Sequence, residues 1–327
     1  DVSIPELQPD KDYAFQGEYS SGRGGWGLQV VATGNGSFNG AMLTGGLPGH
    51  GADGGLRIEF RGAREGDVLK LASDYGDQIT ITNGRIARAT LEDGRRVCMS
   101  KVHRRSPTLG AAPPACSIVL FNGCNTDAFH NGTVNSRRWL EVGTELIPRF
   151  RDYTLHVEFM LPYMPRDNSQ KRGNSGVYLQ SRYEVQILDS FGSMGEFNEC
   201  GSLYRLRPPD INMCLPPLKW QTYDITFRSP RFDAHGTKVR HARITVRHNG
   251  VMIHRDTPIY RKTGAGKAEG PKLLPIRFQD HNDPVHYRNI WLVPHDREYL
   301  KDLSIALQYA PPKSRGILRS RRTWLRR

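Results

Sequence analysis

Short runs that alternate apolar and polar residues, separated by glycine-rich turns, dominate the first hundred residues. They span residues 27–32, 57–60, 67–71 and 78–82, and an Asn-Gly turn at 83–84 follows the last of them. A period of two with a turn signal about every 8–12 residues predicts short antiparallel strands rather than helices. We therefore expect residues 1–110 to form a small, glycine-rich β domain.

This pattern breaks at residues 105–114, which read Arg-Ser-Pro-Thr-Leu-Gly-Ala-Ala-Pro-Pro. Proline fixes its own backbone and restricts the residue before it, so such a stretch continues neither a strand nor a helix. The sequence predicts a proline-rich linker at 111–117 and a second domain at 118–295.

Beyond residue 117 the alternating runs become longer and richer in aromatic residues. Residues 152–161 place Tyr153, Leu155, Val157 and Phe159 on one face, and residues 175–188 are long enough for two adjacent strands. Further runs lie at 221–227, 242–248, 251–254, 276–280 and 287–293. Many evenly spaced strands predict an all-β fold with two packed sheets.

The last segment, residues 296–327, has a different character. An apolar stripe from Tyr299 to Leu307 behind Asp296 as N-cap predicts one short C-terminal helix. Residues 313–327 hold seven Lys and Arg and no acid, so this basic tail supplies seven of the thirteen net positive charges. The rest of the chain is only mildly basic. Since it has no helix-turn-helix, zinc-finger or RNA-platform signature, we expect no nucleic acid partner.

Two further features concern the compartment. No apolar run approaches the roughly 18 residues that a membrane span needs, so we expect no span. The chain begins at Asp1 without an apolar leader, as a mature product of a signal-peptide-bearing precursor would. Since the number of copies in an assembly leaves no signal in this sequence, the oligomeric state stays open.

The five cysteines favour an oxidising, extracytoplasmic location. Cys200 and Cys214 bracket a polar loop, and a disulfide between them would close a 15-residue ring. Such a closure stabilises a fold by about 3 kcal/mol in the chain-entropy account. Two of Cys98, Cys116 and Cys124 could also pair, and which two stays open. No C-x-x-C motif is present, which argues against a thiolate zinc site.

One candidate site lies on residues 182–189, Arg-Tyr-Glu-Val-Gln-Ile-Leu-Asp. In a strand, Arg182, Glu184 and Gln186 point to the face opposite the apolar side chains. A bulge could bring Asp189 to that face as well. A cation, a carboxylate and an amide in register suit sugar hydroxyls, although simple solvent contact is the alternative.

A second candidate lies around residues 278–289. Gln279 and His281 share one face of their strand, and Arg288 begins the returning strand. Histidine exchanges protons near neutral pH, so His281 is a candidate general base or metal ligand; a histidine bonded beside a turn is the alternative. The turn at 171–176, which includes Asn174, lacks the spacing of a phosphate loop, and we interpret it as the polar rim of a binding face.

Six blocks between Val119 and Pro294 resemble the 3-keto-disaccharide hydrolase domain family, which has the concanavalin A-like lectin/glucanase jelly roll. The blocks are Leu-Phe-Asn-Gly (120–123), Gly-Asn-Ser-Gly-Val-Tyr (173–178), Arg-Tyr-Glu-Val-Gln-Ile-Leu-Asp-Ser (182–190), Trp-Gln-Thr-Tyr-Asp (220–224), His-Asn-Gly (248–250), and Gln-Asp-His (279–281) with Arg-Asn-Ile-Trp (288–291). The domain before them resembles the companion found in secreted proteins of planctomycete type. The chain departs from the family at Asn122 and Cys124.

This resemblance implies an extracytoplasmic enzyme that acts on glycosides oxidised at C3, with a carbohydrate as its substrate. It implies His281 as base or metal ligand and Glu184 as its acid–base partner; a divalent metal held by this pair is the alternative role. The residues expected to orient the sugar are Asn174, Tyr178, Arg182, Gln186, Asp189, Gln279 and Arg288.

Two other functions stay open. Glucanases of this fold carry E-x-D-x-x-E, and the same spacing here gives Glu184, Gln186 and Asp189, so a retaining glucanase would use Glu184 and Asp189. A lectin-like module that binds glycans without cleaving them would instead stack sugars on Tyr178, Tyr204 or Trp220.

Overall fold

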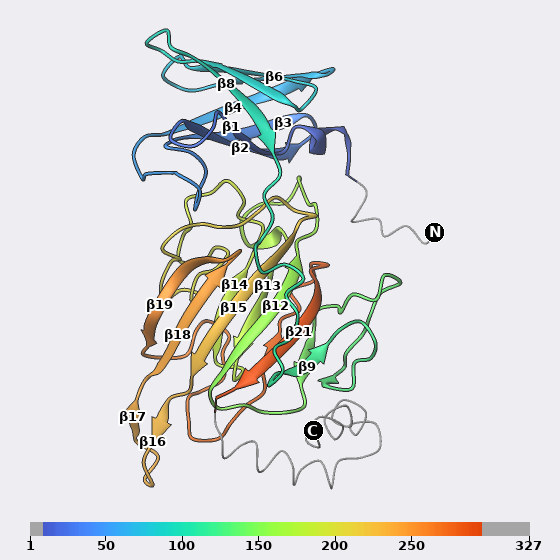
Figure 1. The fold of residues 1–327 in the computed structure, drawn as a ribbon, viewed down its shortest axis with the longest axis vertical. Helices are drawn as coiled ribbons and strands as arrows, with labels where there is room; N and C mark the ends of the chain where they lie inside the picture. Colours follow the sequence, from blue (N-terminus) through green and yellow to red (C-terminus); the bar gives the residue numbers. More distant parts are fainter. Residues whose placement is uncertain (1–8, 296–327) are drawn as a thin grey trace.

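The computed structural model describes residues 9–295, which form a β-barrel followed by a β-sandwich (Figure 1). The barrel strands are β1 Gly17–Ser20, β2 Trp26–Gly34, β3 Ser37–Thr44, β4 Arg57–Glu65, β5 Val68–Ala72, β6 Gln78–Thr82, β7 Ile86–Thr90 and β8 Arg96–Val102. A 3₁₀ helix, η2 (Lys11–Ala14), precedes them. Each strand pairs with the next in antiparallel order, and β1 pairs with β8 to close the barrel. The predicted short antiparallel strands are thus confirmed.

Alternation along the strands fills the barrel interior with apolar side chains, most regularly in β5, β6 and β7. In β5 and β6, Leu69, Leu71, Ile79 and Ile81 are buried, while Lys70 and Thr80 between them are exposed to solvent. The hairpin between β6 and β7 turns at Asn83, whose φ of 50° is the left-handed conformation that Asn tolerates. Closure leaves no unpaired strand edge.

The second unit consists of two packed antiparallel sheets. The five-stranded sheet has the order β10 (Phe129–His130), β11 (Thr144–Leu146), β20 (Arg277–Phe278), β13 (Ser175–Leu179) and β14 (Tyr183–Ile187). The six-stranded sheet has the order β19 (Val251–Ile259), β18 (Ala242–His248), β15 (Trp220–Arg228), β12 (Tyr153–Met160), β21 (His286–Pro294) and β9 (Ile118–Phe121). A ribbon of β16 (Arg231–Phe232) and β17 (Lys238–Arg240) and a 3₁₀ turn, η3 (Ser169–Lys171), complete the unit.

The sandwich core forms from the faces that the alternation predicted. Tyr153, Leu155, Val157 and Phe159 of β12 are fully buried, and Tyr183, Val185 and Ile187 of β14 belong to the same apolar cluster. The intervening residues of each strand must therefore face outward from the core, on opposite sides of the molecule. The all-β fold class is confirmed.

The barrel lies at one end of the sandwich, and the chain that leaves β8 runs down beside the six-stranded sheet toward β9 (Figure 1). Side chains join the two units. The Arg57 guanidinium donates to the Gly192 carbonyl at 2.6 Å, the Arg172 guanidinium to the Ala32 carbonyl at 3.1 Å, and the Tyr13 hydroxyl to the Pro217 carbonyl at 2.8 Å.

The predicted disulfide between Cys200 and Cys214 is wrong, because both are free, buried thiols. Each thiol is already engaged: the sulfur of Cys200 lies 3.2 Å from the Tyr223 hydroxyl, and that of Cys214 lies 3.5 Å from the Leu188 carbonyl. Cys98, Cys116 and Cys124 are exposed free thiols.

Two expectations concern the chain ends and the membrane. The helix predicted from Asp296 and the basic tail lie outside the described residues. In the part of the chain that the structure describes, no helix has the length and apolar character to cross a membrane.

Candidate active site

The candidate site lies on the outer face of the five-stranded sheet. Because Tyr183, Val185 and Ile187 fill the core, Glu184 and Gln186 of β14 point the other way. The register places Glu184 opposite Tyr178 and Gln186 opposite Gly176 on β13, and Tyr178 opposite Arg277 on β20. Gln279, just past β20, donates its backbone N–H to the Gly176 carbonyl. The face therefore contains Glu184, Gln186, Gly176, Tyr178, Arg277 and Gln279.

Glu184 is a buried carboxylic acid with a strongly shifted proton affinity. The residue is 2% exposed, and the Tyr178 hydroxyl donates to its Oε2 at 2.7 Å. The Arg277 guanidinium lies over the Tyr178 ring, 4.2 Å from the ring centre. Burial raises the pKa of Glu184 from 4.5 to about 7, and the bond from Tyr178 and the charge of Arg277 only partly oppose this. Such a carboxyl group can take up or release a proton at neutral pH.

The carboxylate of Glu184 occupies a slot between two glycines. A Cβ atom on Gly176 would lie 2.3 Å from Oε1 of Glu184, so only glycine leaves room for it. On the other side, a Cβ on Gly264 would lie 2.6 Å from the Tyr204 ring and 3.7 Å from Oε2 of Glu184. The loop that contains Gly264 is tied to β14, because the Glu184 N–H donates to the Thr263 hydroxyl at 2.8 Å. The slot is therefore built by the backbone of two separate segments.

Several buried polar atoms on the same face lack a partner among the described residues. They are Oε1 of Gln186, Oε1 of Gln279 and Nε of Arg277. The amide nitrogen of Gln186 is fixed, since it donates to Gln170 Oε1 at 3.2 Å and lies 3.5 Å from Asn174 Oδ1. An unpaired buried polar group costs about 1–3 kcal/mol. Two acceptors and one donor beside Glu184 are thus positioned for a polar ligand.

His281 is exposed, in the segment that follows β20. It lies two residues before Asp283, whose carboxylate accepts the backbone N–H of Asn174 at 2.6 Å. Since Asn174 also contacts Gln186, this segment borders the Glu184 face. The structure therefore places His281 at the rim of the site and Glu184 in its floor.

Arg182 and Asp189, which we expected to orient the sugar, are both held by protein partners. The strand begins at Tyr183, so Arg182 lies in the preceding turn and donates to the carbonyls of Ala268 and Lys272 at 2.8 and 2.9 Å. It holds the loop that covers Glu184. Asp189 lies beyond the end of β14, where its carboxylate pairs with Nε of Arg172 at 2.7 Å.

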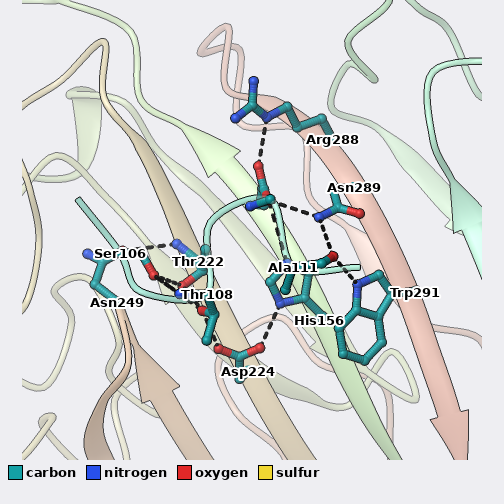
Figure 2. Close-up of polar contacts among 12 residues, drawn as sticks. Ser106, Thr108, Ala111, His156, Thr222, Asp224, Asn249, Arg288, Asn289 and Trp291 are labelled. Carbon is teal, nitrogen blue, oxygen red and sulfur yellow. Dashed lines mark hydrogen bonds and ion pairs between the residues drawn. The ribbon is translucent and has the colours of Figure 1, made fainter. Parts of the chain in front are cut away.

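The structure also does not bring Arg288, which we expected to orient the sugar, to the face that contains Glu184. Arg288 belongs to β21 and lies on the outer face of the six-stranded sheet, where its Nε pairs with Glu158 Oε2 at 2.7 Å (Figure 2). Its guanidinium covers the Trp220 ring at 4.0 Å, so Trp220 offers no open platform for stacking. A position after a turn on the returning strand does not reveal which sheet that strand joins.

Figure 2 shows His156 and Asp224 beside the linker segment that contains Thr108 and Ala111. With Glu158 they form a polar cluster, the Glu158 cluster, that holds this linker. Asp224 accepts from the Thr108 hydroxyl at 2.8 Å and lies 2.6 Å from Nδ1 of His156, and Glu158 accepts the N–H of Gly110 at 2.5 Å. Burial alone would lower the pKa of His156, but hydrogen bonds and charges from Asp224 and Glu158 outweigh it and raise the pKa.

This cluster does not form a nucleophilic triad. In a triad the hydroxyl bonds the imidazole that will take its proton, and the carboxylate bonds the far side of the imidazole. Here the Thr108 hydroxyl bonds the carboxylate of Asp224 instead, and the His156 side chain is fully buried. We therefore interpret the cluster as a structural one that holds the linker against the six-stranded sheet.

Sequence reasoning missed Arg277, Tyr204, Thr263 and Gly264. Arg277 lies two positions before Gln279, so the same alternation that selected Gln279 could have found it. The other three lie in loops that only the fold brings to β14, and nothing in their local sequence marks them.

The expected divalent metal does not fit the donor set. Among residues 9–295, no three His, Cys, Asp or Glu side chains gather as a ligand set. Oε2 of Glu184 already accepts from the Tyr178 hydroxyl, whereas His281 is exposed at the rim. We derive no step through a metal ion.

Comparison with known proteins gives two kinds of match. The model of the 3-keto-alpha-glucoside-1,2-lyase-like domain matches residues 117–293. A crystal structure of a "putative glycosyl hydrolase" from Parabacteroides distasonis ATCC 8503 is 30% identical, covers 55% of this chain and 84% of its own, and has a TM-score of 0.51. A second structure with the same description and organism is 15% identical, covers 55% and 94%, and has a TM-score of 0.41. No curated protein matches.

Proposed function

The chain belongs to the 3-keto-alpha-glucoside-1,2-lyase-like domain family, and from this premise we propose that it cleaves glycosides oxidised at C3, with Glu184 as the group that moves the C2 proton. The family and its glycosyl-hydrolase-like neighbour make it a carbohydrate-active enzyme. The observation that supports the finer proposal is the buried Glu184 carboxyl, whose pKa is raised to about 7 beside unpaired polar atoms.

The chemistry of a 3-keto sugar requires such a group. A ketone at C3 acidifies the hydrogen on C2, and the base takes this proton while the C–H electron pair forms an enolate with its charge on the C3 oxygen. When the carbonyl forms again, a double bond develops between C1 and C2, the C1–O bond breaks, and the leaving oxygen takes a proton. Water then adds to C1 and a proton returns to C2, which gives net hydrolysis.

The site residues divide these tasks by their chemistry. Glu184 takes the C2 proton, because a base with a pKa near the working pH is most effective. Arg277 has an unpaired Nε donor and a fixed positive charge, which suit the enolate oxygen. The free oxygens of Gln186 and Gln279 accept hydrogen bonds from sugar hydroxyls. We assign His281, at the rim, to the proton that the leaving group needs.

The two competing functions are less well supported. A retaining glucanase needs two carboxyl groups about 5–5.5 Å apart. Here the carboxylate of Asp189 is already paired with Arg172. A pure sugar-binding module needs exposed aromatic platforms, yet Trp220 is covered by Arg288 and the Tyr178 hydroxyl is bonded to Glu184. A carboxyl group with a raised pKa is instead typical of catalysis.

The test compares a 3-keto-glucoside with the same glucoside before oxidation, each incubated with the purified protein with and without EDTA. We expect release of the aglycone from the keto substrate alone, unaffected by EDTA. Release from the unoxidised glucoside would favour the glucanase. No release from either, together with measurable sugar binding, would favour the binding module.

A further inference from the structure

A cavity of about 420 Å³ lies where the barrel meets the sandwich. The barrel contributes Val31, Thr33 and Asn39, and the sandwich contributes residues 165–169, Arg172, residues 188–191, Ser193 and Glu199. Its volume lies within the range of about 300–1,000 Å³ that small-molecule sites occupy, and such sites are common at domain interfaces.

Several polar side chains that line this cavity have no hydrogen-bond or ion-pair partner among the described residues. Within residues 9–295, no hydrogen bond or ion pair engages the side chains of Thr33, Asn39, Arg166, Asn168 or Ser169. Together they offer hydroxyl and amide groups, which donate and accept hydrogen bonds, and a guanidinium group, which donates them. A sugar ring presents the complementary hydroxyls.

The inner wall of the cavity is fixed. Arg172 is 5% exposed; it pairs with Asp189 at 2.7 Å and reaches across to the Ala32 carbonyl of the barrel at 3.1 Å. Its Nη2 is buried and has no partner among the described residues. The carboxylate of Glu199 is held by the Ser193 hydroxyl at 2.6 Å and the Gly195 N–H at 2.9 Å. A wall whose groups are already oriented loses little freedom when a ligand binds.

The cavity adjoins the Glu184 face. Leu188 and Asp189, which line it, directly continue the strand that contains Glu184 and Gln186. The turn η3 links the two sites, because its Ser169 lines the cavity while its Gln170 accepts from Gln186. Glu184 and Asp189 are five positions apart, and because β14 ends at Ile187 the distance between them is at most about 16 Å, the length of a fully extended chain. A span of this order reaches past one sugar ring, so the cavity suits a ring beyond the bond that is cleaved.

We infer that this cavity is a distal subsite that binds a neutral sugar ring of an oligosaccharide substrate, and that the barrel thereby takes part in substrate recognition. This inference rests on the proposed function. The ring is neutral because the charges of the lining residues balance. Arg172 pairs with Asp189, the Glu199 carboxylate is held by protein donors, and Arg166 and Asp167 are neighbours of opposite charge.

The test uses two double variants of the barrel. Thr33→Ala with Asn39→Ala removes the barrel groups at the cavity, whereas Thr80→Ala with Gln78→Ala removes an exposed threonine and amide from β6, outside it. Each is assayed on a 3-keto-disaccharide and on a 3-keto-oligosaccharide with two further sugar rings. Two lost hydrogen bonds predict a roughly tenfold lower kcat/KM for the cavity variant on the long substrate only. If the cavity variant lowers kcat/KM relative to the wild type by the same factor on both substrates, or on neither, the inference is overturned.

Calorimetry with the unoxidised oligosaccharide separates this inference from the proposed function. If the wild-type protein cleaves neither keto substrate, the proposed function fails. Binding of the unoxidised oligosaccharide that the cavity variant loses and the β6 variant keeps would still support the subsite. Identical binding by all three proteins, or no binding to the wild type, would overturn it.

Discussion

Replacing Tyr178 with phenylalanine tests how the site sets the proton affinity of Glu184. The substitution removes the hydroxyl that donates to Oε2 at 2.7 Å and keeps the ring under the Arg277 guanidinium. The hydroxyl stabilises the ionised carboxylate and so lowers its pKa. Without it, less remains to counter the rise in pKa that burial causes. The pKa of Glu184 therefore rises further above its present value of about 7.

The size of this rise follows from the hydrogen bond that is lost. A bond to a charged acceptor contributes roughly 1.5–3 kcal/mol, and one pKa unit corresponds to about 1.4 kcal/mol. We expect the pKa of Glu184 to rise by about one to two units in Tyr178→Phe. As the base must be ionised to act, the acid limb of kcat/KM moves to higher pH by the same amount, while the rate at the alkaline plateau changes less.

The matched control is Tyr183→Phe. Tyr183 is the neighbour of Glu184 in β14, but its hydroxyl donates to Glu269 at 2.5 Å rather than to Glu184. Both variants lose one hydroxyl bonded to one carboxylate, so their general effects on the fold should be similar. The reasoning is refuted if the acid limb stays in place in Tyr178→Phe, or if it moves equally in both variants.

Three further predictions follow from the same contacts. Gly176→Ala should abolish activity in a folded protein, because its Cβ would lie 2.3 Å from Glu184 Oε1; normal kcat would contradict the slot. Because the pKa of Glu184 is raised in the folded state, the wild type loses stability as the pH rises from 4.5 to about 7. Glu184→Gln lacks this loss, so between pH 4.5 and pH 8 its free energy of unfolding in urea should improve by about 3 kcal/mol relative to that of the wild type. The raised pKa of His156 stabilises the fold fully below pH 6.5, and this stability is lost as pH rises through that pKa. In His156→Gln this loss should be absent. A free energy of unfolding that depends on pH as in the wild type would contradict the role given to His156 in the Glu158 cluster.

Alternation predicted the core because it depends only on neighbouring residues. The faces of β12 and β14 followed directly from it, and so did the position of Glu184 and Gln186 opposite the core. The same argument could not predict that loops cover this outer face, and loop cover is what raises the pKa of Glu184 to about 7. The sequence therefore indicated the chemistry of the site but not its burial.

The failures concern residues whose partners come from distant segments. Arg288 pairs with Glu158 because β21 inserts beside β12 in the six-stranded sheet. Arg172 pairs with Asp189 and also reaches the barrel. Nothing local to these arginines distinguishes a structural ion pair from a free cation that awaits a ligand.

The central claim is that Glu184 removes the proton from C2 of a 3-keto sugar. The most direct test follows a 3-keto-glucoside labelled with deuterium at C2, alongside the unlabelled substrate, with the wild type and with Glu184→Gln. The account predicts slower release from the labelled substrate by the wild type, and neither release nor exchange of the C2 hydrogen with solvent by Glu184→Gln. Equal rates for the two substrates, together with undiminished exchange in the variant, would contradict it.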